Sequence, residues 1–233
     1  SAVMSKLDLD QNALEHEPWL TLFSQIKADV GAAGRDTRIF LCGSAFGGTG
    51  ASGFPTIGRL IANQLKKEGF RKNVKLGGAL LLPYFEFSVP PDFNAGDEIY
   101  ARPEQFLLNT EAALRYYRTQ AGGTFDTIYL LGNQDLSPVK KFSLGRGEQR
   151  NEPHFIELYA ALAVQHFLSH IPTQAGEAVV ISRGDPRRIT WEDIPGSDVR
   201  QKMANSTRFA FAWTTDIVNT LRQAQQAFEQ FPT

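Results

Sequence analysis

Apolar residues recur every three or four positions in several segments, which is the period of an amphipathic α-helix. One such segment covers residues 18–30, with Pro18 at a position that suits the first turn of a helix. The same pattern predicts helices over about 52–68, 103–120, 152–169 and 216–231. The segment 152–169 is apolar around much of its circumference, which predicts a largely buried central helix.

Short apolar runs lie between the predicted helices and indicate buried strands. These runs cover residues 38–42, 74–82, 126–131 and 178–181, whereas 209–213 fits either a strand or the start of a helix. Strands that alternate with helices predict an α/β fold with a mostly parallel sheet and helices on both faces. The polar segments 83–101 and 132–151 are predicted loops, and their length suggests a functional role.

Composition narrows the classes of function. The 233 residues include 24 Lys plus Arg and 25 Asp plus Glu, a net charge of -1. This balance offers no basic excess for binding nucleic acid or an anionic membrane. No apolar run reaches the roughly 18 residues of a membrane helix, and the first residues lack the apolar stretch of a signal peptide. We therefore expect a cytoplasmic protein without a nucleic-acid or membrane partner.

The cysteine and histidine content argues against a metal centre. Cys42 is the only cysteine, so a multi-cysteine zinc site is excluded. It precedes a glycine-rich segment and is expected to be a buried strand residue without an activating base. His166 and His170 stand four residues apart on a predicted helix, but a third ligand is missing. We expect no metal-binding residues of this kind.

The most informative segment is residues 43–53, Gly-Ser-Ala-Phe-Gly-Gly-Thr-Gly-Ala-Ser-Gly, called the glycine turn below. It follows a predicted strand and opens a predicted helix, at the edge where α/β sheets bind ligands. Glycines allow positive φ and the close approach of an anion, and N–H groups at a helix start can hold phosphate. We expect phosphate contacts from Gly43, Ser44, Gly47, Gly48, Thr49 and Gly50. The alternative is a tight crossover without a ligand.

Two common nucleotide-binding motifs fit the glycine turn poorly. A Walker loop requires a lysine, and the turn has none. The spacing Gly48-x-Gly50-x-x-Gly53 agrees loosely with a dinucleotide-binding fingerprint, but the next predicted strand ends at Pro83 instead of an acidic residue. The chain also lacks the Tyr-x-x-x-Lys pair of short-chain dehydrogenases. A Rossmann protein that binds NAD(P) is therefore an alternative and not the first choice.

The run Gly47-Gly48-Thr49-Gly50-Ala51-Ser52-Gly53 resembles the signature loop of the tubulin/FtsZ superfamily, Gly-Gly-Thr-Gly-(Ser/Thr/Ala)-Gly, with one extra residue before the last glycine. The order of elements is similar too. A helix and a strand precede the loop, and a helix follows it. Next come a strand that ends in Pro83-Tyr84, a helix that ends in the basic segment 115–118, and a strand that leads to Asn133. The resemblance covers roughly residues 18–195 and is strongest to divergent bacterial tubulin-like proteins.

This resemblance implies a protein that binds GTP or GDP at the glycine turn, with Mg²⁺ as a candidate companion ion. It makes Asn133 a candidate guanine contact and likens 152–169 to the long core helix of the family. In the family, acidic residues after the core helix act on the nucleotide of the next subunit, so a GTPase would depend on head-to-tail self-association. Glu192 and Asp193 best resemble those catalytic carboxylates, although the family spacing Asn-x-Asp is absent and an acidic helix start is the alternative.

The resemblance also sets the expected domains. Residues 1–170, including the helix 152–169, would form the nucleotide-binding α/β domain, and 171–233 a partial second domain. The first strand of the family and its glycine-rich phosphate loop have no counterpart in this sequence. We therefore expect either a fragment or a site that has decayed, which leaves GTPase activity open. A non-catalytic tubulin-like scaffold or interaction protein is the main alternative.

Several further side chains admit two interpretations. Tyr84, Phe85 and Phe87 follow the second predicted strand and could line a base pocket or belong to the core. Five basic residues could reach phosphates or could simply be solvated, namely Arg115, Arg118, Lys140, Lys141 and Arg146.

Overall fold

The computed structural model describes residues 16–32, 36–90, 101–120, 123–139, 152–169, 179–181, 190–194 and 197–229. The chain divides into two compact units, Ser1–Ile189 and Thr190–Thr233. The division falls after Ile189 and not after residue 170 as expected. The reason is that strand β6 (Val179–Ile181) pairs with a strand of the first unit.

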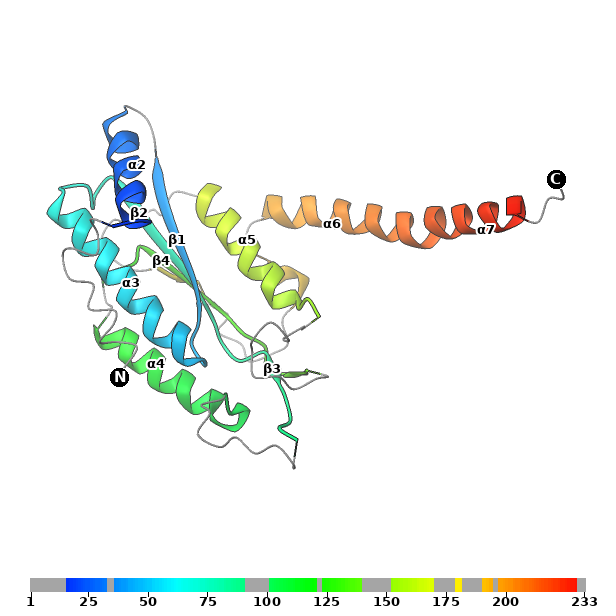
Figure 1. The fold of residues 1–233 in the computed structure, drawn as a ribbon, viewed down its shortest axis with the longest axis horizontal. Coiled ribbons are helices and arrows are strands. Elements are labelled where there is room, and N and C mark those ends of the chain that lie inside the picture. Colours follow the sequence, from blue (N-terminus) through cyan, green and yellow to red (C-terminus); the bar gives the residue numbers. More distant parts are fainter. Residues whose placement is uncertain are drawn as a thin grey trace. The chain divides into compact units, whose positions relative to one another are not determined.

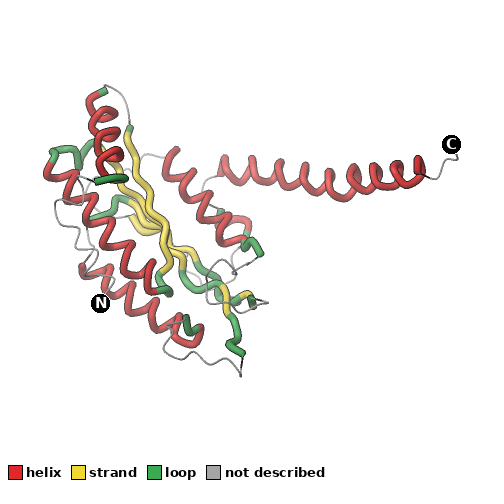
Figure 2. The backbone as a smooth tube through the Cα atoms, in the orientation of Figure 1, coloured by secondary structure: helices red, strands yellow, loops and turns green. Residues whose placement is uncertain are grey.

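The first unit is built on a four-stranded sheet in the order β1-β2-β4-β6. Strands β1 (Thr37–Ser44), β2 (Val74–Leu81) and β4 (Thr127–Leu131) fall where the apolar runs predicted them. All neighbouring pairs are parallel, which confirms the expected parallel α/β sheet. A short second sheet joins β3 (Phe85–Glu86) to β5 (Ser137–Pro138) within the two predicted loops (Figure 2).

Helices cover both faces of the sheet, as predicted (Figure 1). One face carries α2 (Trp19–Gly31), α3 (Gly48–Lys67) and α4 (Phe106–Gln120), the last preceded by the turn η2 (Pro103–Gln105). The other face carries α5 (Phe155–Ser169). Side chains alternate along β1 accordingly. Ile39 and Leu41 join the core under α3, whereas the ring of Phe40 lies 5.3 Å from that of Phe167 on α5.

Two adjacent glycines in the middle of β2 receive phenylalanine rings from both layers. A Cβ on Gly77 would lie 2.7 Å from the ring of Phe167, and one on Gly78 would lie 2.5 Å from that of Phe54. The ring of Phe125 stacks on Phe54 at 4.7 Å. Successive residues of a strand point to opposite faces, so each glycine admits a ring from one layer. These glycines bring the helices close to the sheet without interrupting the strand.

A proline inside α3 is compensated by a tyrosine of α4. Pro55 has no N–H group, so the carbonyl of Ala51, four residues earlier, loses its helical partner. The hydroxyl of Tyr117 donates to this carbonyl at 2.7 Å. Burial, together with the nearby Tyr116, raises the pKa of Tyr117 to about 12, so the hydroxyl stays protonated and able to donate. This bond ties α4 to the first half of α3.

A buried ion pair joins β2 and β4 at their amino ends. Both guanidinium NH groups of Arg71 donate to the carboxylate of Asp126 at 3.1 Å. Asp126 also accepts a hydrogen bond from the backbone N–H of Leu76 at 2.7 Å. Arg71 also donates to the carbonyls of Val74 and Thr124, and such additional hydrogen bonds are the condition under which a buried charge is tolerated.

Helix α5 differs from the predicted central buried helix. The buried residues of its inner face are Ile156, Tyr159, Leu162, Ala163 and Phe167. Its outer face exposes Phe155, Leu158 and Leu168 by 41%, 40% and 53%. The prediction of a largely buried helix therefore holds for only one side of α5, the side that packs on the sheet.

The second unit is mainly helical. The turn η3 (Trp191–Asp193) is followed by α6 (Ser197–Ala212), the π turn η4 (Trp213–Ile217) and α7 (Val218–Glu229), which run on as one helix. The ambiguous segment 209–213 is thus helical, and the helix predicted from residue 216 begins at Ser197. Within the described ranges, no helix is long and apolar enough to cross a membrane.

The Tyr117 hydrogen bond can be tested by a single substitution. We expect Tyr117→Phe to lower the free energy of unfolding by about 1–3 kcal/mol, because the carbonyl of Ala51 would be left without a donor in a partly buried place. Tyr116→Phe is the matched control, since Tyr116 is exposed and accepts from Arg59 on the surface, and its cost should be within about 0.5 kcal/mol. Urea denaturation followed by circular dichroism measures both. Equal losses in the two variants would contradict the role of Tyr117.

Candidate functional site

Three strands end side by side at the carboxyl edge of the sheet. Ser44 of β1 is level with Leu81 of β2, which is level with Leu131 of β4. The glycine turn, Pro83-Tyr84 and Gly132-Asn133 therefore emerge along one edge. Neighbouring strands lie about 4.8 Å apart, so the ends of β1 and β4, from which the turn and the Asn133 loop emerge, are separated by about 10 Å, which a nucleotide can span. Open α/β sheets bind their ligands at this edge.

Backbone hydrogen bonds continue the sheet beyond the strand ends. The N–H of Ala45 donates to the carbonyl of Leu81 at 2.8 Å, and the N–H of Leu82 donates to that of Leu131 at 2.7 Å. The N–H of Asn133 donates to the carbonyl of Pro83 at 3.3 Å. The three loops are thus fixed to one another at their origins.

The glycine turn contains the start of α3, which begins at Gly48, four residues before its predicted start. The N-cap residue is Gly47, whose lack of a side chain leaves the helix without a side-chain cap. The N–H groups of Gly48, Thr49 and Gly50 meet no acceptor among the described residues. Together with the positive end of the helix dipole, they form a donor group suited to an anion.

Close packing explains part of the glycine content of the turn. A Cβ on Gly50 would lie 2.6 Å from the backbone nitrogen of Ser44 and would also overlap its carbonyl oxygen, so the first turn of α3 rests directly on the end of β1. A Cβ on Gly47 would lie 3.2 Å from the hydroxyl oxygen of Ser44, and one on Gly43 would lie 3.4 Å from Phe54. The expected use of positive φ is wrong, because among the described glycines only Gly69 and Gly123 adopt it.

Gly48 has a different environment. A Cβ at this position would meet no atom within 4 Å, and the residue is exposed. Neither close packing nor a positive φ requires glycine at position 48. The open space lies over the first turn of α3, where its N–H groups are available.

The hydroxyl side chains of the turn differ in their availability. The Ser52 hydroxyl donates to the carbonyl of Gly48 at 2.7 Å, so it is engaged within α3. Thr49 is exposed, and its hydroxyl has no partner among the described residues. The hydroxyl of Ser44 lies beside the first turn of α3. Ser44 and Thr49 are therefore the hydroxyls that could assist the backbone N–H groups.

Aromatic side chains pack together beside the glycine turn and form what we call the edge aromatic cluster, Phe46, Tyr84, Phe85, Phe87 and Phe106. The ring of Phe46 lies 5.0 Å from that of Phe106, 5.5 Å from that of Phe85 and 6.1 Å from that of Tyr84. Phe46, Tyr84 and Phe106 are buried. This packing favours a core role for Tyr84, and only Phe85 and Phe87 retain partial exposure toward a ligand. The sequence did not single out Phe46 or Phe106, although Phe46 lies within the turn itself.

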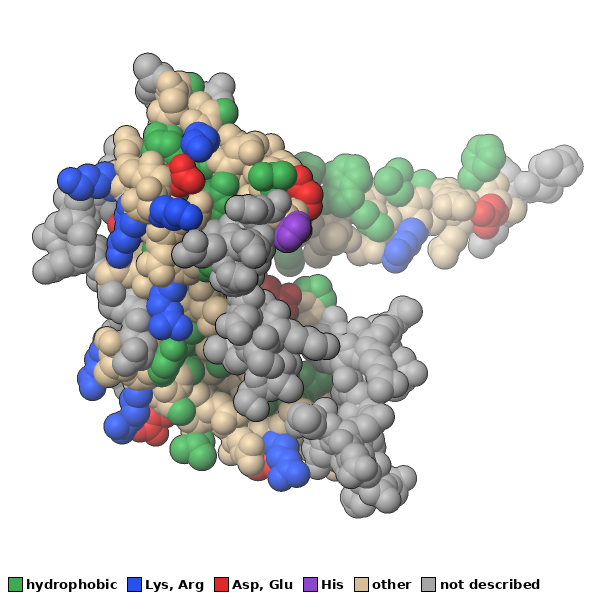
Figure 3. Space-filling model, turned by 60° about the vertical axis from the view of Figure 1, so that its left-hand side comes forward, with side chains coloured by type: hydrophobic (Ala, Val, Ile, Leu, Met, Phe, Trp, Pro, Cys, Tyr) green, Lys and Arg blue, Asp and Glu red, His purple; other side chains and the backbone are tan. Residues whose placement is uncertain are grey.

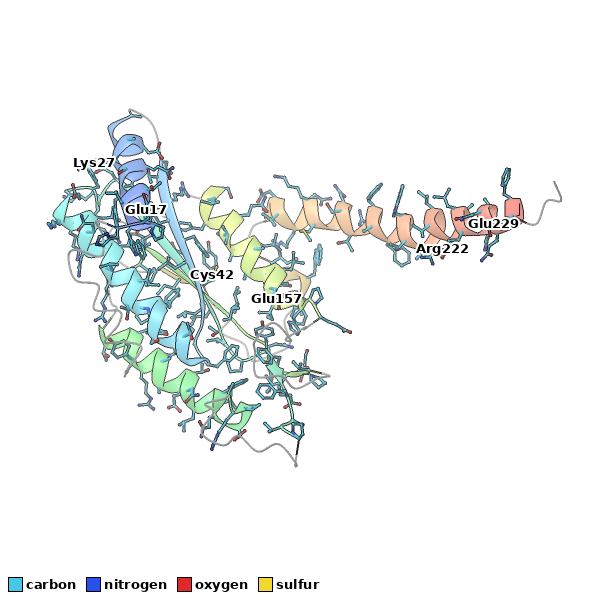
Figure 4. All side chains as sticks on the ribbon, in the orientation of Figure 1. Glu17, Lys27, Cys42, Glu157, Arg222 and Glu229 are labelled. Carbon is cyan, nitrogen blue, oxygen red and sulfur yellow. The ribbon has the colours of Figure 1, made fainter. Side chains whose placement is uncertain are left out.

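A histidine, a serine and a glutamate meet next to this cluster. His154 Nε2 lies 2.9 Å from the Ser137 hydroxyl, and its Nδ1 accepts from the N–H of Ile156 at 3.1 Å. The neutral ring therefore carries its proton on Nε2 and donates to Ser137. To activate a serine, the histidine must instead accept the proton of the hydroxyl. The His154–Ser137 pair therefore caps the start of α5 and does not activate the hydroxyl. Burial lowers the pKa of His154, and the charge of Glu157 on α5 (Figure 4) opposes the shift only in part.

Asn133 lies at the edge where the resemblance expects a guanine contact. Its Nδ2 group donates to the carbonyl of Asp135 at 2.7 Å, which holds the amide in place. Its Oδ1 atom has no hydrogen bond within the described ranges and could accept from a base.

The two candidate catalytic carboxylates belong to the second unit. Asp193 accepts from the backbone N–H of Thr190 at 2.7 Å and from its hydroxyl at 3.0 Å. This is the arrangement of an acidic helix start, and it occupies the carboxylate of Asp193. Glu192 is exposed. Between the two, Glu192 retains the freer carboxylate.

The remaining candidates do not gather at the edge. Arg115 and Arg118 lie in the last turns of α4, on either side of Tyr117, and Arg115 pairs with Glu111 at 2.6 Å. Lys and Arg side chains are scattered over the face shown in Figure 3. Cys42 is exposed and not buried as predicted, because it lies near the end of the edge strand β1. Desolvation raises the pKa of its thiol, which does not favour a nucleophilic thiolate.

Some predictions fall outside the described residues, namely those on His170, Lys140, Lys141 and Arg146. Within the described part of the chain, no group of three or more His, Cys, Asp or Glu side chains could hold a metal ion.

The His154 cap predicts a dependence of stability on pH. The fold holds the pKa of His154 below its unfolded value of about 6.5. Its contribution is therefore complete above about pH 6.5 and is lost as the pH falls through the lower, folded value. We expect His154→Asn, which can still cap α5 but does not titrate, to lose less unfolding free energy between about pH 7 and about pH 5 than the parent protein.

Ser137→Ala is the matched control, since it removes the hydroxyl partner but keeps the titrating ring. Urea denaturation at the two pH values measures the difference. The same loss in His154→Asn as in the parent would contradict the prediction.

Comparison with protein-family models, with curated proteins and with solved structures finds no match to this chain.

Proposed function

We propose that the glycine turn binds the phosphate groups of a guanine nucleotide, GTP or GDP, with Mg²⁺ as a candidate companion ion. The observation that carries the proposal is Gly48. It opens α3 with no side chain, with free space above it and with three N–H groups beside it. The packing of the turn requires glycine at position 50 but not at position 48. An anion that approaches the backbone accounts for a glycine there.

The carboxyl edge offers a place for the rest of the nucleotide. Asn133 follows β4, whose end lies two strands, about 10 Å, from the end of β1 that leads into the turn. Its Oδ1 atom could accept from the N–H groups on the pairing edge of guanine, which adenine does not present in the same positions. The partly exposed rings of Phe85 and Phe87 provide an apolar surface nearby.

The resemblance to the tubulin/FtsZ superfamily supports guanine over other bases. It rests on the loop sequence 47–53 and on the order of strands and helices around it. We extend the proposal to a cytoplasmic, bacterial, tubulin-like protein on the same grounds. GTP hydrolysis would then require head-to-tail association that brings Glu192 of one subunit to the nucleotide of another. A non-catalytic scaffold and an NAD(P)-binding protein are the competing functions.

Nucleotide titration tests the proposal directly. We expect GDP and GTP to raise the melting temperature and to bind in calorimetry, whereas guanosine, ATP, NAD and NADP bind at least about tenfold more weakly. Gly48→Asp should abolish the response, because its carboxylate would occupy the place of the phosphate and repel it. The open space at Gly48 means that the fold should tolerate this change.

Gly31→Asp is the matched control. Gly31 ends α2, and a Cβ at this position would meet no atom within 4 Å, so this variant adds the same charge away from the carboxyl edge. It should bind GDP as the parent does. Binding that survives Gly48→Asp would refute the site, a preference for NAD or NADP would refute guanine, and no response to any nucleotide would favour the scaffold.

A further inference from the structure

The helix formed by α6, η4 and α7 carries a continuous apolar stripe on its surface. The stripe is defined by Phe209, Trp213, Ile217, Leu221, Ala224 and Phe228. Its five large side chains are exposed by between 41% and 81%. Figure 3 shows apolar side chains standing out along this helix. An exposed apolar row of this length on a helix indicates a surface for a partner.

The π turn keeps the stripe on one side of the helix. Steps of four residues advance by about 40° beyond a full turn in an α-helix, so a row of such steps winds around the axis. The turn η4 covers the step from Trp213 to Ile217, and its wider winding offsets this drift. Phe211 lies two residues from Phe209, about 200° around the helix, and is off the stripe.

The sequence of the stripe distinguishes between two ways of pairing with a second copy. Lys202 lies seven residues before Phe209, within about 20° of the stripe. Parallel pairing would place Lys202 against Lys202 and Trp213 against Trp213, a charge repulsion and a steric conflict. Antiparallel pairing about a two-fold axis near residues 218 and 219 places Trp213 against Ala224, and it carries Lys202 beyond the end of the stripe of the other copy.

The charges along the helix favour the same arrangement. The α6 segment carries Asp198, Arg200, Lys202 and Arg208 and is net basic, whereas the rest of the helix carries Asp216, Arg222 and Glu229 and is net acidic. Arg222 and Glu229 mark this second half in Figure 4. With the two-fold axis near residues 218 and 219, antiparallel pairing places Arg208 of one copy level with Glu229 of the other, and Arg222 level with the position next to Asp216. Parallel pairing brings like halves together.

The area available fits a weak to moderate dimer. An aromatic side chain can bury about 150–250 Å², and the stripe contributes three aromatic and two aliphatic side chains per copy. At their exposed fractions, two copies could bury on the order of 1,000 Å², at the lower end of specific interfaces. We expect dissociation constants in the micromolar range on this basis.

We propose that the chain forms a two-fold symmetric dimer in which the helix 197–229 pairs antiparallel with that of a second copy. The contact is isologous, so it closes on itself after two subunits. It is therefore distinct from any head-to-tail contact at the carboxyl edge. It requires no nucleotide.

Sedimentation of the full chain over a range of concentrations tests the dimer. We expect a monomer–dimer equilibrium without nucleotide that is unchanged by Gly48→Asp. Leu221→Asp should weaken the association at least about tenfold, because it buries a charge in the stripe. Phe211→Asp is the matched control, since Phe211 is 68% exposed but lies off the stripe, and it should leave the association unchanged.

Cysteine cross-linking tests the orientation. In a Cys42→Ser background, Phe209→Cys and Phe228→Cys chains should form a mixed disulfide when combined, because antiparallel pairing brings these positions together. Each variant alone should cross-link poorly. Efficient self-cross-linking of each variant would overturn the antiparallel arrangement. A monomer at every concentration, or equal effects of Leu221→Asp and Phe211→Asp, would overturn the dimer and leave another protein or another segment to cover the stripe.

Discussion

The close approach of α3 to the sheet is the constraint on which the rest of the first unit depends. No side chain separates Gly50 from the end of β1, and Gly58 and Gly78 admit the ring of Phe125 from opposite sides. A methyl group at any of these positions would push helix and sheet apart. Because they are glycines, α3 begins directly over the last residue of β1. Its free N–H groups are thereby presented at the carboxyl edge, level with the ends of β2 and β4.

Tertiary contacts stabilise the start of α3 against its own composition. Gly50 and Gly53 each cost about 1 kcal/mol in a helix, and Pro55 costs about 3 kcal/mol. Burial of Phe54 and Phe125 contributes about 1.5–3 kcal/mol each, and the Tyr117 hydrogen bond contributes about 1 kcal/mol. The unfavourable glycine and proline terms and the favourable burial and hydrogen-bond terms are therefore similar in size. The first turns of α3 are thus held by packing, with the edge aromatic cluster as their support.

Periodicity predicted the four strands, their parallel order and the position of the glycine turn, because buried strands and amphipathic helices leave strong local patterns. It failed where the outcome depends on long-range contacts. The ring of Phe46 meets Phe106 across about 60 residues of chain, and the Ala51 carbonyl meets Tyr117 from another helix. The apolar composition of α5 predicted a largely buried helix, because composition alone does not show that Phe155, Leu158 and Leu168 are exposed. Helix α6 was not predicted, because its sequence is mostly polar and, of its residues, the structure buries Val199.

The central claim is that the N–H groups at the start of α3 hold phosphate, and backbone amide NMR tests it most directly. Titration with GDP should shift the amide signals of Gly48, Thr49 and Gly50 more than any others, and guanosine should not, because it lacks the phosphates. Shifts confined to other parts of the chain, or equal shifts with guanosine, would contradict the claim.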